Sequence, residues 1–146
     1  MMKTRVAIAV LLAGTLACGG SPPSSPSPNT SLNLSGTWTG TFQFATSGVT
    51  ITDNVSATLA QTGQDVTGTW RADSGVSGQL TRLTPQASTT GTMTISQTTL
   101  TGTVCSATAN VSGSASASTI DLTVAQIPPA GVCQWANSMQ LALRRQ

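Results

Sequence analysis

The chain has 146 residues, of which six are basic and four acidic, and it contains no histidine, glutamate or tyrosine. So few charges exclude the basic patch that nucleic-acid binding requires, and the missing residue types remove most candidates for general acid–base catalysis. We therefore expect one small domain that is not an enzyme, binds no nucleic acid and requires neither a metal ion nor another cofactor.

The first residues have the pattern of an export signal. Lys3 and Arg5 precede an apolar run at residues 6–17. This run is too short to span a bilayer as a helix but is typical of a secretory signal peptide. It passes into the sequence TLAC at residues 15–18, which resembles the lipobox of bacterial lipoproteins, although its first two positions depart from the usual pattern.

The lipobox resemblance implies that the Cys18 thiol carries a diacylglycerol and that residues 1–17 are removed. Two or more acyl chains would then hold the protein stably on a membrane. Gly19 stands where the inner-membrane lipoproteins of Gram-negative bacteria carry aspartate, so the resemblance also implies the outer membrane of a bacterial envelope. The alternative is a plain secretory signal that happens to contain a cysteine.

The next segment separates the signal from the body of the chain. Residues 19–30 read GGSPPSSPSPNT and contain no charge and no large apolar side chain. Such a segment cannot bury a core and stays extended. We therefore expect a signal peptide at residues 1–17, a lipidated cysteine with its tether at 18–33, and a folded domain at 34–146.

The body of the chain repeats one short pattern: an apolar residue, threonine or serine, glycine, a polar residue and, in most copies, a second apolar residue. Copies occur at residues 34–38, 66–70, 76–80, 100–104 and 111–115, with a weaker one at 89–93. From Gly68 to Gly113 the glycines of the pattern recur every 10 to 13 residues. Strands that recur at this spacing are typical of an all-β sandwich or barrel.

Alternate residues of these segments are apolar, which predicts strands with one buried face. The side chains and glycines expected on that face are Trp38, Gly40, Phe42, Phe44; Ile51, Val55, Ala57, Leu59; Val66, Gly68, Trp70; Val76, Gly78, Leu80; Met93, Ile95; Leu100, Gly102, Val104; Ile120, Leu122, Val124; and Trp135, Met139, Leu141, Leu143. Inward glycines let a sheet curl, and closure hides its edges. The sequence thus predicts an antiparallel up-and-down meander of eight to ten strands that closes into a small barrel, with a β-sandwich as the alternative.

Two cysteines remain after Cys18. Exported proteins meet oxidising conditions, in which a remaining pair of cysteines usually forms a disulfide. We therefore expect Cys105 and Cys133 to be bonded, which would stabilise the domain by roughly 3 kcal/mol in the chain-entropy account. Two free thiols are the alternative.

The two ends of the domain carry a second resemblance. Gly36-Thr37-Trp38 begins the first expected strand, and Arg145 lies at the end of the last one. This pairing resembles the calycin superfamily, which includes lipocalins, fatty-acid-binding proteins and avidins. The resemblance implies that Gly36 and Trp38 close one end of a barrel and that Arg145 packs on the indole ring. Arg144, on the opposite face, is expected in solvent.

Two functions are compatible with this pattern. The first is a lipocalin-like module that binds a small apolar ligand in the barrel. The candidate lining is Trp70, Trp135, Val111, Ala115 and Ala117. The tryptophans can equally be ordinary core residues, and large side chains can fill so small a barrel.

The alternative function is an envelope interaction or inhibitor module that acts through its loops. The candidate loop for this second function is QIPPAGVC at residues 126–133, because two prolines and the expected disulfide would stiffen it.

Overall fold

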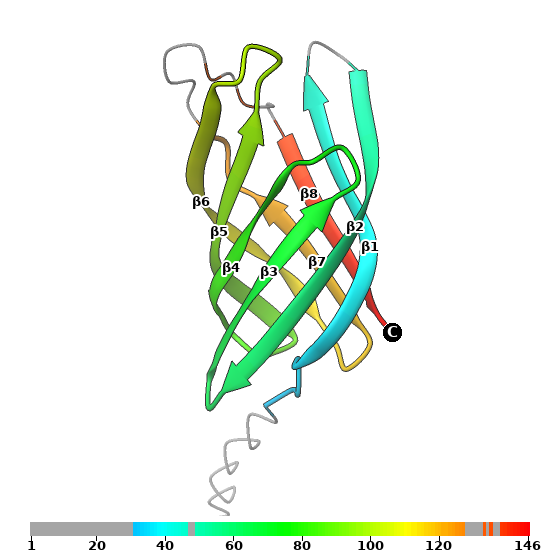
Figure 1. The fold of residues 1–146 in the computed structure, drawn as a ribbon. Coiled ribbons are helices and arrows are strands. Elements are labelled where there is room, and N and C mark those ends of the chain that lie inside the picture. The colour runs from blue at the N-terminus through cyan, green and yellow to red at the C-terminus, as the bar shows by residue number, and fades with distance from the viewer. Residues whose placement is uncertain (1–30, 47–48, 128–132, 134, 136–137) are drawn as a thin grey trace, which may run out of the picture.

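The computed structural model describes residues 31–46, 49–127, 133, 135 and 138–146. Eight strands follow one another along the chain: β1 (Gly36–Thr46), β2 (Val49–Thr62), β3 (Asp65–Ala72), β4 (Ser77–Leu83), β5 (Ser88–Thr98), β6 (Val104–Ala115), β7 (Thr119–Val124) and β8 (Ser138–Arg145). Each strand pairs antiparallel with the next, and β8 pairs with β1. The sheet is therefore a closed up-and-down barrel (Figure 1), as the sequence predicts, and not a sandwich. Among the described residues no helix is long and apolar enough to cross a membrane.

The alternation of apolar and polar residues forms the barrel core. In β3 and β8, for example, every second side chain is buried and most of those between are exposed. The buried cluster contains members of all eight strands and of the segments that flank β1, β4 and β7. Its members are Leu34, Trp38, Phe42, Val55, Ala57, Leu59, Val66, Trp70, Ala72, Val76, Leu80, Leu83, Met93, Ile95, Ala109, Val111, Ala115, Ile120, Leu122, Val124, Ile127, Met139, Leu141 and Leu143.

Inward-facing glycines lie where neighbouring strands approach closely. Gly40 of β1 pairs with Leu143 of β8, and a Cβ atom at Gly40 would collide with the main-chain carbonyl of Ala142. A Cβ atom at Gly78 of β4 would likewise collide with the main-chain carbonyl of Thr94. A larger residue at either place would push the strands apart, so these glycines allow the tight curvature that closes a small barrel.

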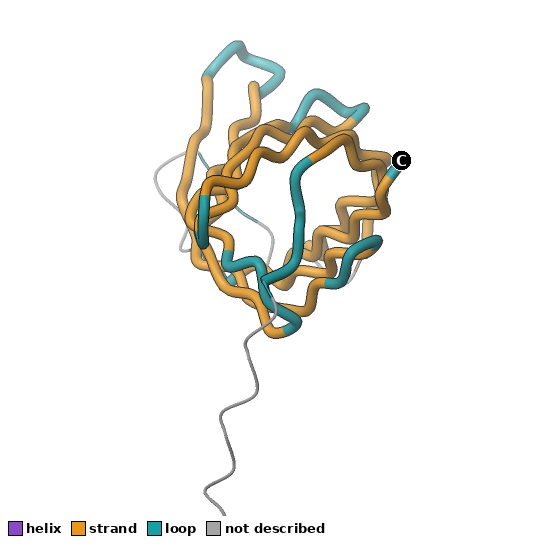
Figure 2. Tube along the Cα trace, turned by 90° about the horizontal axis from the view of Figure 1, so that it is seen from below, coloured by secondary structure: helices purple, strands orange, loops and turns teal. Residues whose placement is uncertain are grey.

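The barrel has two different ends. The lower end in Figure 1 carries the β2–β3, β4–β5 and β6–β7 turns together with the C-terminus, and the upper end carries the β3–β4 and β5–β6 turns. Seen from below, the segment at residues 31–35 crosses the lower opening before it enters β1 (Figure 2). The main-chain amide of Leu32 donates to the carbonyl of Pro85 in the β4–β5 turn at 2.8 Å, which fixes this crossing segment.

One predicted strand is wrong. The LTGTV sequence at residues 100–104 is not an inward-facing strand but most of the β5–β6 turn. Leu100 is fully exposed, Gly102 has a φ of +81°, and Val104 begins β6 on the outer wall. The Gly102 amide donates to the carbonyl of Thr99 at 2.9 Å, as in a tight turn. The repeated glycine pattern cannot distinguish a glycine that curls a strand from one that supplies a positive φ in a turn.

Candidate functional site

The lower end of the barrel is closed by a plug built around Trp38. Its indole nitrogen donates to the main-chain carbonyl of Leu34 at 3.1 Å, and both side chains are fully buried. The guanidinium of Arg145 lies over the Trp38 ring, 5.0 Å from its centroid. The same guanidinium donates to the carbonyls of Asn33 and Ser35 at 2.7 and 2.8 Å. Arg145 therefore binds the crossing segment to the end of β8, over the tryptophan.

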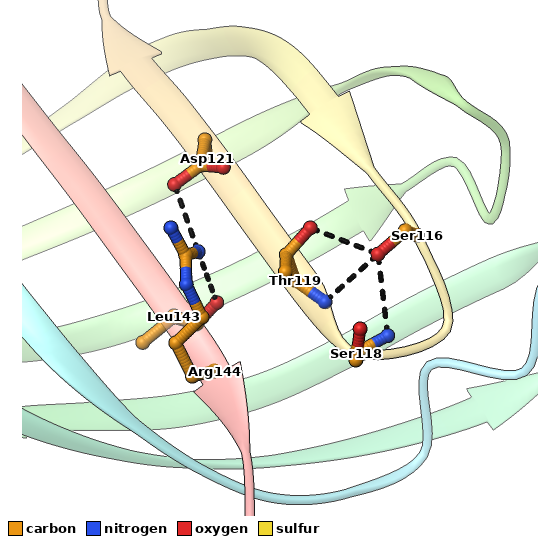
Figure 3. Close-up of polar contacts among 6 residues, drawn as sticks. All are labelled: Ser116, Ser118, Thr119, Asp121, Leu143 and Arg144. Atoms are coloured by element: carbon orange, nitrogen blue, oxygen red, sulfur yellow. Dashed lines mark hydrogen bonds and ion pairs between the residues drawn. The ribbon is translucent and has the colours of Figure 1, made fainter.

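The neighbouring Arg144 lies on the outer wall. Its guanidinium forms an ion pair with Asp121 of β7 at 3.1 Å and donates to its neighbour's carbonyl, that of Leu143 (Figure 3). About half of each charged side chain is exposed, so this ion pair contributes little to stability. Beside it, the hydroxyl of Ser116 accepts hydrogen bonds from the amides of Ser118 and Thr119 and closes the β6–β7 turn.

The upper end has a different surface. The exposed large hydrophobic residues of the described chain are Val49, Ile51, Leu100 and Val104. Val49 and Ile51 begin β2, Leu100 lies in the β5–β6 turn and Val104 begins β6, so all four lie at the upper end. We call these four residues the upper apolar set. Single exposed hydrophobic residues are ordinary, but their gathering at one end marks a candidate binding surface.

The lengths of the strands explain why Val49 and Ile51 are exposed. Both have the parity of the buried residues of β2, and Ile51 was expected in the core. However, β3 ends at Ala72, which pairs with Val55, so β2 continues upward without its neighbour. Phe44 of β1, which pairs with Ile51, is likewise only half-buried. The inner wall of the β1–β2 hairpin therefore meets solvent here.

Two carboxylates lie beside this uncovered hairpin. The amide of Ser74, in the β3–β4 turn, donates to the carboxylate of Asp53 at 2.8 Å. Hydrogen bonds from the Ser74 side chain and amide lower the pKa of Asp53 below its ordinary value of 3.8. Asp73 accepts a hydrogen bond from the side-chain amide of Asn54 at 3.3 Å. Both contacts attach the β3–β4 turn to β2 and place negative charge beside the upper apolar set.

The predicted disulfide is confirmed. Cys105 of β6 and Cys133 are bonded, with a Cα–Cα distance of 5.6 Å. Cys105 is buried near the upper end of β6, so the bond fixes Cys133 at this end. Of the candidate loop at 126–133, residues 128–132 lie outside the described residues, whereas Ile127 is buried in the core.

The predicted ligand-lining residues do not form one surface. Val111 and Ala115 of β6 are buried on the inner wall, and Trp135 is half-buried against the core. Ala117 is exposed in the β6–β7 turn, so its prediction is wrong. The alternation that holds within β6 ends with the strand at Ala115.

Trp70 is a core residue with one unusual property. Its ring is almost fully buried, and its centroid lies 5.0 Å from that of Phe42. The indole nitrogen is buried without a hydrogen-bond partner in the described part of the chain. An unpaired buried donor costs about 1–3 kcal/mol, so this group would gain from an acceptor.

Sequence reasoning missed the plug at residues 31–35 and the uncovered start of β2. Leu32 and Leu34 gave a weak signal for the plug, because they share parity with Trp38 and precede a glycine. Nothing in the sequence marked where β3 stops relative to β2. Within the described ranges, no group of three or more cysteine or acidic side chains could hold a metal ion.

These features define a class: a small, closed, eight-stranded antiparallel barrel with one plugged end, which is compatible with a calycin-like fold. No family model, no curated protein and no solved structure matches the chain.

Proposed function

We propose that this protein is a lipid-anchored, non-catalytic module of the bacterial envelope that binds another protein through the upper end of its barrel. One observation carries the proposal: the four exposed large hydrophobic residues of the described chain gather at one end. Exposed apolar residues that gather on one part of a protein surface are typical of interaction sites. The disulfide fixes the chain at the same end, which lowers the entropy lost on binding.

The anchor agrees with this orientation. If Cys18 carries the lipid, residues 19–30 form a tether of at most about 40 Å that joins the barrel at its lower end. The upper apolar set then lies at the end of the barrel opposite the tether. The Cys18→Ser variant tests the anchor, since it should leave the membrane fraction and accumulate as soluble or uncleaved protein. A wild-type chain that fractionates as fully soluble would refute the anchor.

Photo-crosslinking in the native host tests the interaction. A photoreactive residue at Leu100 or Val104 should give a discrete adduct with another protein. The matched control places the same residue at the exposed Asp65, the first residue of β3, or at Ser118 in the β6–β7 turn, both at the lower end, and should give none. Equal labelling from both ends, or none from the upper end, would contradict the proposal.

A second candidate function is supported by the unpaired indole of Trp70. In a calycin-like barrel, a small apolar ligand that carries a hydrogen-bond acceptor could pair with this nitrogen. Native mass spectrometry of protein from its own host distinguishes the two functions. A co-purified small molecule that is lost in the Trp70→Phe variant favours the ligand, whereas a protein partner favours the interaction module.

A further inference from the structure

The closed barrel has an open edge at its upper end. Val49–Asn54 of β2 pair with Thr41–Thr46 of β1 on one side. On the other side, β3 pairs with β2 only as far as Val55. Of residues 49–54, Asn54 alone makes a main-chain hydrogen bond on that side in the described part of the chain: its carbonyl accepts from the amide of Asp73 at 3.0 Å. We call Val49–Asp53, which has no strand on that side in the described part of the chain, the β2 edge.

The geometry of the β2 edge fixes which main-chain groups are unpaired. In an antiparallel ladder the amide and carbonyl of one residue point to the same neighbouring strand, and successive residues alternate. The main-chain carbonyl of Asn54 points toward the β3 side, and the register with β1 is continuous. The main-chain amides and carbonyls of Thr52 and Thr50 therefore point to that side too. The described residues provide no partner for their amides and carbonyls on that side. The main-chain amides and carbonyls of Ile51 and Asp53 point to β1.

The edge has few of the features that usually protect an exposed strand. Natural edges are blunted by charged side chains, above all lysine, and by proline, bulges or short length, and Asp53 is the one charged side chain of the β2 edge. The segment VTITD contains neither lysine nor proline, and four of its five residues are β-branched. Four of its residues are exposed and Asp53 is partly exposed. In Figure 1 strands β1 and β2 rise beyond the β3–β4 turn.

We infer that the β2 edge accepts an extended segment of another protein as an added strand, in the place that β3 leaves empty. In this mode main-chain hydrogen bonds supply affinity and alternate side chains supply specificity. Thr50 and Thr52 provide the hydrogen bonds, and the exposed inner side chains of Val49 and Ile51 cover apolar residues of the incoming strand. The inference rests on the proposed function and specifies how the partner binds.

Charge decides which kind of strand fits. Asp53 and Asp73 flank the edge, and no lysine or arginine occurs in residues 49–54, 73–76 or 97–104. The nearest cation along the chain, Arg71, lies lower on β3, opposite Ser56. The incoming segment should therefore combine alternating apolar residues with a lysine or arginine. A second copy of this chain fits poorly, because it would bring more carboxylates and no cation to the same place.

The probe for this inference is a displayed library of short random peptides, selected on the full chain. A peptide selected there should combine apolar alternation with a basic residue. On binding, hydrogen exchange should slow at the amides of Thr50 and Thr52 but change little at Ile51 and Asp53, whose amides already bond to β1. This alternation would not arise if the peptide bound only through side chains.

A matched pair of variants completes the test. Thr52→Pro removes an edge amide that β1 does not use, so proline is tolerated there, and it should weaken peptide binding at least about tenfold. Thr52→Val keeps the amide and should bind normally. The melting temperature of each variant verifies that it is folded.

Three results would overturn the inference: no peptide selected, a peptide that binds Thr52→Pro as tightly as wild type, or wild-type dimers that protect the same two amides. Photo-crosslinking from Leu100 separates this failure from failure of the proposed function. An adduct that persists in Thr52→Pro would support the proposed interaction with another protein but would contradict strand addition.

Discussion

At the scale of single residues, the two adjacent arginines at the end of β8 have different roles. Arg145 stacks on Trp38 and donates to two carbonyls of the crossing segment, whereas Arg144 forms an exposed ion pair with Asp121. A cation–π contact together with charged hydrogen bonds is worth more than a surface ion pair. The stability of the plug therefore depends on Arg145.

We predict that Arg145→Ala lowers the free energy of unfolding by about 2 kcal/mol, and that Arg144→Ala lowers it by less than about 1 kcal/mol. Denaturant titration of both variants measures this difference. In a double-mutant cycle Arg145→Ala should couple to Trp38→Phe, because the two side chains touch. Equal effects of the two arginines without coupling would mean that the contacts of Arg145 with the plug do not stabilise the fold.

At the scale of elements, the β3–β4 turn is attached to β2 through Asp53. Because hydrogen bonds from Ser74 lower the pKa of Asp53 in the folded protein, the ionised form is bound more tightly there than in the unfolded chain. The stabilisation is complete above the ordinary pKa of 3.8 and is lost as the pH falls through the lowered pKa.

The Asp53→Asn variant should therefore melt below wild type at pH 7. The difference in melting temperature should shrink as the pH falls below about 4. Asp65→Asn, at the exposed β2–β3 turn, is the control and should follow wild type at both pH values. A difference between Asp53→Asn and wild type that is the same at pH 7 and pH 2.5 would contradict the role given to the carboxylate.

The inward glycines also act on elements, because each sets how closely two strands approach. Gly40→Ala should lower the free energy of unfolding by at least about 2 kcal/mol, since the added methyl group meets the carbonyl of Ala142. Thr39→Ala, on the exposed outer wall of the same strand, should cost less than about 1 kcal/mol. Thermal denaturation of both variants measures the contrast, and an equal loss in the two would show that close approach at Gly40 is unimportant.

For the whole molecule, the alternation of apolar and polar residues and the spacing of the turns were sufficient to predict a closed all-β meander. The buried residues of β3, β7 and β8 are those that the alternation predicts. Parity states which face a residue occupies but not how far the neighbouring strand extends. Ile51 therefore has core parity without a core environment, because β3 stops at Ala72. The exposure of Leu100 and Ala117 has a related cause, since each lies where a strand gives way to a turn.

The candidate site was less predictable than the fold for the same reason. The upper apolar set exists because β2, β5 and β6 differ in length from β3 and β4, and strand length depends on pairing between distant residues. The disulfide joins residues of recognisable type, so the sequence could suggest it, and the contact between Trp38 and Arg145 was implied by the calycin resemblance. The unpaired edge of β2 has no residue signature and becomes visible only in the assembled barrel.

The most direct test of the central claim, that the upper end binds another protein, is the size of the complex that the chain enters. Membranes of the native host would be solubilised mildly and analysed by native electrophoresis. Wild type should migrate well above the size of the 14.7 kDa chain. A variant with Leu100→Ser and Val104→Thr should migrate as free protein with an unchanged melting temperature, because both side chains are exposed. Identical migration of the two proteins, whether free or complexed, would contradict binding through the upper end.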